Sequence, residues 1–327
     1  FVYTLAGSLA MLLGILALYF RTQTFDMVQL ARLGPALEPA FQRLLFVAFF
    51  LGFAIKVPIF PFHTWLPDAH VDAPTPISVL LAGVLLKMGG YGFFRISYPL
   101  FPAGAQWFAW TMALLGMINI VYGAFVAMAQ LDFKRLVAYS SVSHMGFVLL
   151  GLASLTVAGM NGAYLQMFNH GLITGGMFLL VGVLYERAHT RQLDAFGGLG
   201  AKVPVYAGML IFFSLASLGL PGLAGFVSEF LALVGTFGVW QWQTAVSVIG
   251  LVVTAAYMLT AIQRVLLGPL NARWNALTDM NRVELASLVP LLVLVLLVGL
   301  YPDSVLRLQQ ETIAALIHHV AAALGRG

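Results

Sequence analysis

Long apolar stretches separated by short polar ones run through most of the chain. A stretch of about 17–25 apolar residues is long enough to cross a bilayer as a helix, and the sequence contains nine such stretches. They cover residues 1–20, 41–61, 76–98, 107–129, 135–156, 160–185, 203–239, 242–267 and 284–301. The pattern therefore predicts an all-α, polytopic membrane protein with nine spans.

Two of these spans contain residues that interrupt helices. Proline removes one intrahelical hydrogen bond and clashes with the carbonyl one turn back, so we expect each of the two spans to be a broken helix. The first break is predicted at residues 56–67 and the second at residues 219–229. The breaking residues are Pro58 and Pro61 in the first, and Pro221 and Gly222 in the second.

The positions of the breaks suggest internal symmetry. They are five helices apart, and this odd spacing means that two copies of a repeated unit would cross the membrane in opposite directions, as inverted repeats do. The last span, at 284–301, would be followed by an amphipathic tail helix at 303–325, peripheral to the bundle.

Composition agrees with a membrane protein and excludes several kinds of site. The chain is 61% hydrophobic and only 9% charged, whereas a soluble domain is about 25% charged. It has no cysteine, which excludes thiolate zinc sites and cysteine-ligated iron–sulfur clusters. No strand–GxGxxG–helix pattern for a nucleotide is present. We therefore expect no cofactor and no metal in this chain.

One polar segment could suggest a metal site. Asp68, His70 and Asp72 lie together in "PDAHVDAPTP", which runs from residue 67 to residue 76. The prolines in and around this segment favour a turn capped by the aspartates instead. The sequence therefore predicts a capped turn here rather than a metal site.

The basic residues predict an orientation. Arginine and lysine concentrate in cytoplasmic loops, and the loops after the fourth, sixth and eighth spans carry most of them. These residues are Lys134, Arg135, Arg187, Arg191, Lys202, Arg264, Arg273 and Arg282. The side that they share is predicted to face the cytoplasm.

Five ionisable residues lie at bilayer depth, where such side chains are rare and usually functional. They are Lys56, Lys87, His144, His170 and Glu229. Both lysines lie too deep in their spans to reach the interface by snorkelling. Desolvation favours the neutral form of a lysine, so a buried lysine can take up and release a proton, whereas arginine stays charged. The set is interpreted as a proton pathway, with water between its members.

Other interpretations remain open for the histidines and the glutamate. His144 and His170 could be packing residues, or could ligate a haem iron if their helices faced each other across a large cavity. A proton relay suits the neutral pKa range of histidine better. Glu229 could cap the amides of the second half-helix or carry protons at one end of the pathway.

Two long motifs resemble one known family. They are "KVPIFPFHTWLPDAHVDAPTPISVLLAGVLLKMGGYGFFR", which begins at Lys56, and "DFKRLVAYSSVSHMGFVLLG", which begins at Asp132. Both are similar to the antiporter-like, proton-pumping subunits of respiratory complex I (NADH–quinone oxidoreductase). Within that family they most resemble the group called chain M in bacteria and chain 4 in mitochondria. The residues His70 and Lys87 favour this group.

The resemblance implies a fold of fourteen helices with two inverted five-helix repeats, of which this chain would hold the last nine. Residues 1–98 would then hold three helices of the first repeat, and residues 107–267 would hold the whole second repeat. It implies that Lys56 is the channel lysine and Lys87 the connecting lysine. His144 and His170 match the central relay, and Glu229 matches the exit carboxylate. The family's carboxylate partner of the channel lysine would lie upstream of Phe1.

The resemblance also implies a function and a setting. We expect a proton-translocating subunit in the bacterial inner membrane or an organellar inner membrane, beside other membrane subunits, especially neighbouring antiporter-like ones. FMN, iron–sulfur clusters, NADH and quinone would be bound by partner subunits, and no nucleic acid is expected. The alternative is a subunit of a multisubunit Na⁺/H⁺ antiporter.

Overall fold

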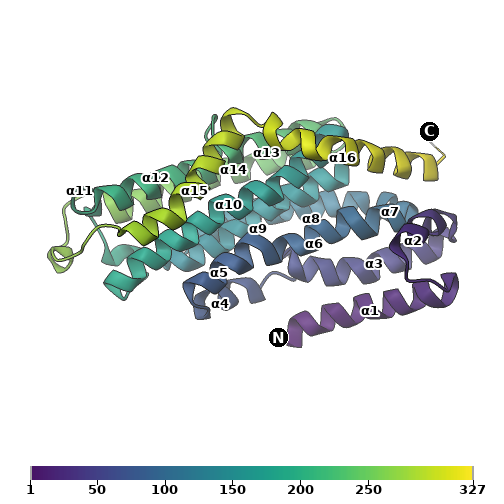
Figure 1. Ribbon diagram of the computed structural model, residues 1–327, viewed down its shortest axis with the longest axis horizontal. Helices are drawn as coiled ribbons and strands as arrows, with labels where there is room; N and C mark the ends of the chain where they lie inside the picture. The colour runs from purple at the N-terminus through teal and green to yellow at the C-terminus, as the bar shows by residue number, and fades with distance from the viewer. Residues whose placement is uncertain (1, 326–327) are drawn as a thin grey trace.

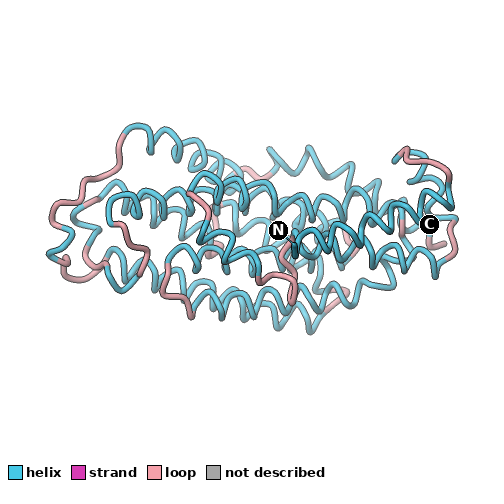
Figure 2. Tube along the Cα trace, turned by 90° about the horizontal axis from the view of Figure 1, so that it is seen from below, coloured by secondary structure: helices cyan, strands magenta, loops and turns pink. Residues whose placement is uncertain are grey.

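The computed structural model describes residues 2–325 as helices joined by short loops (Figures 1 and 2). No β-sheet forms within this described part. Among residues 2–325, eight helical segments are long and apolar enough to cross a membrane. They are α1 (Val2–Thr22), α3 (Pro39–Lys56), the compound segment Thr75–Leu100, α8 (Pro102–Met128), α9 (Phe133–Ser154), α10 (Val157–Ala188), α14 (Gln241–Leu266) and α15 (Arg282–Leu300).

The remaining predicted span, residues 203–239, is a pair of half-helices. α12 (Pro204–Ser217) and α13 (Ala224–Phe237) are both apolar and too short to cross a membrane alone. The all-α, polytopic fold predicted from the sequence is therefore confirmed, with the seventh predicted span divided in two. Between and after the spans lie several short helices and the longer tail helix: α2 (Met27–Leu33), η1 (Gly34–Ala36), η4 (Leu193–Ala195), α11 (Leu199–Lys202), η5 (Ala272–Trp274) and α16 (Asp303–Ala323).

The first break separates α3, which ends at Lys56, from α4 (Trp65–Asp72). The capped turn expected at residues 67–76 was wrong, because α4 continues to Asp72 and only residues 73–74 lie between it and the next helix. Pro67 lies in the first turn of α4, where a helix needs no donor from the backbone, so the proline is tolerated there. Asp68, His70 and Asp72 are therefore helical.

The span after the first break contains two π turns. It consists of α5 (Thr75–Leu80), η2 (Leu81–Leu85), α6 (Leu86–Gly92), η3 (Phe93–Ser97) and α7 (Tyr98–Leu100). π turns within α-helices are frequent at functional sites. Lys87 is the second residue of α6, directly after the first π turn.

The second break is shorter than predicted. It occupies residues 218–223, so Glu229 lies inside α13 rather than in the break. Gly219 and Gly222 have φ values of +81° and +93°. Glycine adopts this left-handed region without strain, and the two glycines, with Pro221 between them, explain why α12 cannot continue into α13.

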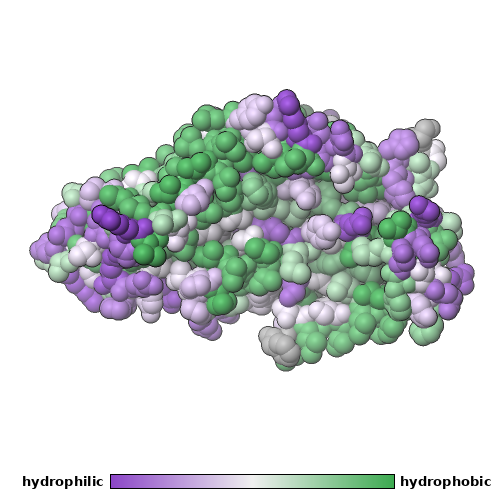
Figure 3. All heavy atoms as spheres, viewed as in Figure 1, coloured by the Kyte–Doolittle hydropathy of each residue, from purple (hydrophilic) through white to green (hydrophobic). Residues whose placement is uncertain are grey.

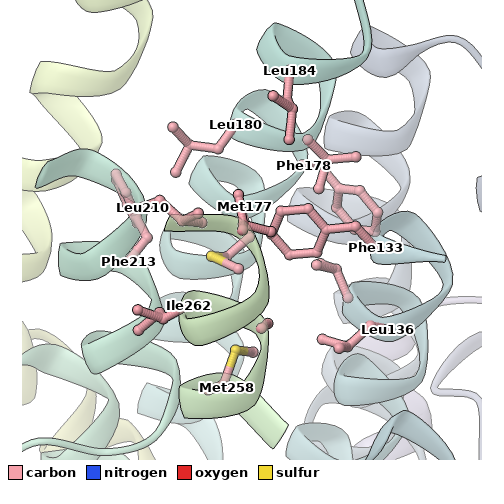
Figure 4. Packing of buried hydrophobic residues seen from close by; sticks show 14 of the residues in the cluster. Phe133, Leu136, Met177, Phe178, Leu180, Leu184, Leu210, Phe213, Met258 and Ile262 are labelled. Carbon is pink, nitrogen blue, oxygen red and sulfur yellow. The ribbon is translucent and has the colours of Figure 1, made fainter. Parts of the chain in front are cut away.

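α9 and α10 form the centre of the bundle, and both are buried along most of their length. One end of this centre is packed by large apolar side chains from α9, α10, α12 and α14 (Figure 4). They include Phe133, Met177, Phe178, Phe213 and Met258.

The surface is divided along the long axis of the molecule. Hydrophobic residues cover much of the middle of the visible face, and hydrophilic residues gather mainly near its two ends (Figure 3). α16 runs along the outside of the bundle, past α10 and α7 (Figure 1). Gln309 of α16 donates to the carbonyl oxygen of Asn161 at 2.9 Å, and a ring nitrogen of His319 lies 3.0 Å from the Pro99 oxygen. The tail is thus an ordered helix packed on the bundle.

Candidate functional site

The first helix break is held by a side chain from a neighbouring helix. Asn119 of α8 accepts from the Phe60 amide at 2.7 Å and donates to the Pro58 carbonyl oxygen at 3.1 Å. Trp65 donates through its indole nitrogen to the Ile55 oxygen at 2.8 Å. Backbone groups freed by a break at membrane depth must be satisfied by protein or water, and these side chains satisfy three of them.

Lys56 is the last residue of α3 and lies at the edge of this break. It is partly buried. Its ammonium group forms no hydrogen bond or ion pair with the residues that the structure describes, and it does not join the other four predicted site residues. Its Cβ atom lies close to Gly89 of α6, two residues from Lys87.

Lys87 does have partners. Its ammonium group lies 2.6 Å from Nδ1 of His170 and also donates to the Ala82 carbonyl oxygen, which belongs to the preceding π turn. The same side chain lines a groove of about 550 Å³ between the compound span and α10. A direct lysine–histidine contact at this distance is suitable for proton exchange between the two groups.

His144 of α9 and Glu229 of α13 form a buried pair. Nδ1 of His144 lies 2.8 Å from Oε1 of Glu229, and the two side chains are only 5% and 4% exposed. The other ring nitrogen of His144 lies 3.1 Å from the hydroxyl of Ser217, the last residue of α12. The pair and the Ser217 contact therefore join α9 to both halves of the second broken helix.

Amide and hydroxyl side chains surround this pair. Gln166 donates to the same Glu229 oxygen at 3.1 Å and accepts from Ser228 at 2.5 Å. Asn169 donates to the Ser228 hydroxyl at 3.0 Å and to the carbonyl oxygen of Ala224, the first residue of α13, at 2.7 Å. The carboxylate is thus oriented by a network that also holds the start of α13.

A small cavity lies between the Lys87–His170 contact and the His144–Glu229 pair. It has a volume of about 10 Å³ and is lined by residues that include His144, His170, Ser217 and Glu229, which is about the size that one water needs. The two imidazole rings are 5.7 Å apart at their centroids. Nε2 of His170 and Oε2 of Glu229 are buried without a protein partner, so a water in this cavity has two groups to bond.

The structure therefore brings four predicted residues into one line, in the order Lys87, His170, His144 and Glu229. The expectation of water between every pair of members was wrong. Two of the three steps are direct contacts, because α10 packs against the compound span and α9 packs against α13. Gly171 of α10, which faces Gly83, allows the first of these close approaches.

The cavity also decides against the haem interpretation of the histidines. A porphyrin cannot enter about 10 Å³, and both rings already contact protein side chains. Among residues 2–325, no cluster of three or more histidines and carboxylates is arranged to hold a metal ion.

Several residues of the network were not identified from the sequence. They are Asn119, Gln166, Asn169, Ser217 and Ser228. One signal for part of the set was available, because Gln166, Asn169 and His170 recur at helical spacing on one side of an otherwise apolar helix. Ser217 and Asn119 carried no comparable signal.

Comparison with known proteins identifies the family. The family described as "NADH:quinone oxidoreductase/Mrp antiporter, TM" matches residues 1–256. The chain belongs to this family. It is 45% identical to "NADH-quinone oxidoreductase subunit M" of Rhodobacter capsulatus, and the match covers 99% of this chain and 66% of that protein. It is 42% identical to "NADH-ubiquinone oxidoreductase chain 4" of Chondrus crispus, with 94% of this chain and 62% of that protein covered. The chain thus spans less than two thirds of the length of these relatives.

Solved structures of relatives agree. A chain of respiratory complex I from Thermus thermophilus, solved with bound NADH, superposes with a TM-score of 0.91 at 35% identity, covering 98% of this chain and 68% of that one. A chain of the Mrp complex from Dietzia has a TM-score of 0.84 at 22% identity, covering 98% and 68%, and so shares the fold. The antiporter-like fold of complex I subunits is therefore shared by this chain.

Proposed function

We propose that this chain conducts protons across the membrane as an M-type subunit of an NADH–quinone oxidoreductase. The observation that carries the proposal is the line from Lys87 through His170 and His144 to Glu229. An apolar bundle gains no stability from four ionisable groups unless they are paired, and each of these four is aligned with a proton donor or acceptor on the next helix.

The contacts support a specific order of proton transfer. Protonated Lys87 can pass a proton to Nδ1 of His170 at 2.6 Å. His170 can then release its other proton from Nε2, since His170 lines the same cavity as Glu229, whose Oε2 has no protein partner. One water in that cavity would complete the transfer. His144 and Gln166 meanwhile hold the other carboxylate oxygen, which leaves Oε2 available to the incoming proton.

The subunit would act within a larger assembly. NADH oxidation and quinone reduction would take place in partner subunits that carry FMN and iron–sulfur clusters, and this chain would hold no redox centre. Neighbouring antiporter-like subunits and the lipid bilayer would surround it. The membrane would be the bacterial inner membrane or an organellar inner membrane, because the relatives described above are subunits of NADH–quinone and NADH–ubiquinone oxidoreductases.

The test compares two lysines in the assembled complex. Lys87→Met should assemble and should lower the number of protons pumped per NADH in membrane vesicles, because the line then lacks its first titratable group. Lys202→Met is the control, since Lys202 is exposed on α11 and outside the line. Unchanged pumping by Lys87→Met would refute the proposal, and Na⁺-dependent proton flux without NADH would favour the Na⁺/H⁺ antiporter alternative.

A further inference from the structure

Asn119 lies where the first helix break, α8 and α9 meet. Its side chain is fully buried. Besides its bonds to Phe60 and Pro58, its amide nitrogen lies 3.5 Å from the carbonyl oxygen of Val142 in α9. Val142 precedes His144 by two residues. One amide thus touches both the break beside Lys56 and the helix segment that carries the relay histidine.

The chemistry of an amide suits this position. The break leaves one backbone donor and one backbone acceptor, and asparagine is a short side chain that offers one of each. A leucine has nearly the same size and can bond neither group. An aspartate can accept from the Phe60 amide, but it can donate to the Pro58 oxygen only when it is protonated.

Near Asn119, α8 and α9 pack too closely to move independently. Ser143 donates through its hydroxyl to the carbonyl oxygen of Ile120, the residue after Asn119, at 2.8 Å. A Cβ atom on Gly123 would come within 2.7 Å of the Ser143 backbone nitrogen. Because the two helices touch through backbone atoms, a displacement of Asn119 must displace the Val142–His144 segment as well.

An asparagine side chain also holds the second break. Asn169 of α10 holds the start of α13 through the Ala224 oxygen and the Ser228 hydroxyl, and it precedes His170 directly. Each break is therefore fastened by an asparagine that is close in sequence, or in space, to a relay histidine. This repetition supports a role in the relay beyond local packing.

We propose that Asn119 is a positioning residue that fixes the first helix break and couples its conformation to the His144–Glu229 pair. The inference rests on the proposed function, because it assumes that Lys56 and the His144–Glu229 pair belong to one proton-pumping cycle. A change of conformation at the break shifts the Pro58 oxygen and the Phe60 amide. Asn119 carries that shift to α9 and so changes the alignment of His144 with Glu229.

The experiment uses the whole complex in vesicles with three variants. Asn119→Leu removes both bonds to the break, and Asn119→Asp keeps one. Asn161→Leu is the control, because it removes a buried asparagine that bonds Gln309 of α16 rather than either break. The readouts are protons pumped per electron, the rate of quinone reduction, and hydrogen exchange of the Phe60 amide.

Asn119→Leu is expected to exchange the Phe60 amide at least tenfold faster and to pump fewer protons per electron, while quinone reduction is less affected. Asn119→Asp is expected to recover its proton-to-electron ratio as pH falls, since protonation restores the donor. Asn119→Leu has no donor that protonation could restore, so it should show no such recovery. Asn161→Leu should change none of these readouts.

Two outcomes would overturn the inference. One is an Asn119→Leu complex with a wild-type proton-to-electron ratio. The other, decisive even if Asn119→Leu does not assemble, is an Asn119→Asp complex with a lowered ratio that is independent of pH. Neither outcome touches the proposed function, which fails only if Lys87→Met pumps normally. The two ideas can therefore fail separately.

Discussion

Two glutamates with little exposed surface show, at the level of single residues, how a fully paired carboxylate differs from the one in the proposed proton pathway. Glu284 is bound by both terminal nitrogens of Arg187, at 2.7 and 2.8 Å, and also accepts from the backbone of Asn281. Both of its oxygens are satisfied by groups that do not titrate. Glu229 has one oxygen without a protein partner among the described residues, and its other oxygen lies beside a histidine ring nitrogen. Arginine stays charged whereas histidine can take up or release a proton, so only the second arrangement offers a partner that can exchange one.

Replacing each glutamate by glutamine separates the two roles. Glu229→Gln keeps an acceptor for His144 and Gln166, so we expect normal assembly and a proton-transfer step slowed by roughly 10²-fold or more. Glu284→Gln should lower stability by about 1–3 kcal/mol, because it weakens a charged hydrogen-bond pair, and should leave pumping intact. The measurements are proton uptake driven by NADH and thermal unfolding of the purified complex. Normal pumping by Glu229→Gln would contradict the assignment.

Lys56 permits a second prediction at this scale. Lys56→Ala and Lys56→Arg should both assemble and both reduce proton pumping, because alanine cannot carry a proton and arginine cannot release one. A purely electrostatic role for the lysine would instead be rescued by arginine. Comparison of the two variants in NADH-driven vesicles thus decides whether Lys56 titrates or only supplies a positive charge.

The sequence pointed to ionisable residues, four of which the structure brings together, and it missed their neutral neighbours for a physical reason. A lysine or glutamate in an apolar stretch is conspicuous because desolvating a charge is so unfavourable. Asn119 and Ser217 are compatible with many apolar helices and become significant only through contacts across 61 and 73 positions of the chain. Their partners follow from tertiary packing, which hydropathy does not encode.

At the level of secondary-structure elements, glycines decide how closely the helices approach. α8 and α9 meet through Gly116, Gly123 and Gly146, where an added Cβ atom would lie 2.6–3.0 Å from atoms of the facing helix. Small residues at such crossings permit backbone contact in membrane bundles. The same close approach brings Asn119 to Val142, two residues before His144.

A matched pair of glycine substitutions tests this packing. Gly123→Leu must push α9 away from α8, and overpacking of this kind destabilises by about 1–3 kcal/mol or more. Gly208→Leu is the control, because Gly208 is exposed on α12 and a Cβ atom added there would meet no other atom within 4 Å. We expect a lower unfolding temperature of the complex for Gly123→Leu alone. Equal stability of the two variants would show that the α8–α9 contact is not constrained at Gly123.

Helix breaks illustrate what a sequence pattern specifies about an element. Proline and glycine located both breaks, because their backbone limits are local properties. The extent of each break was less well predicted. The structure continues α4 through Pro67 and starts α13 at Ala224, before Glu229. Where a helix resumes depends on tertiary contacts to its first turn, such as the bond from Asn169 to the Ala224 carbonyl oxygen at the second break.

On the scale of the whole molecule, the two breaks and the central line belong to one continuous bundle. α9 and α10 provide the histidines, and each also packs against a broken helix: α9 against α4 and α13, α10 against α12 and α13. The proposed repeats, 1–98 and 107–267, would therefore communicate through buried polar contacts rather than through a flexible linker.

Substitutions in α16 can test whether this tail helix stabilises the assembled complex without taking part in proton transfer. Gln309 is buried and bonds Asn161, while its neighbour Gln310 is exposed. Gln309→Ala should loosen α16 by about 1–3 kcal/mol, since the Asn161 groups lose their partner, and Gln310→Ala should have almost no effect. The measurement is the yield of intact complex after detergent extraction, with protons pumped per NADH recorded on the surviving fraction.

Deletion of the chain after Asp303 extends the same comparison. It should lower the yield further than Gln309→Ala, because it also removes the buried Ile313 and Val320 and the contact between His319 and Pro99. The complexes that do assemble should pump normally, because none of these residues lies in the line from Lys87 to Glu229. A full yield of complex with lost pumping would reverse the assignment and make α16 part of the proton pathway.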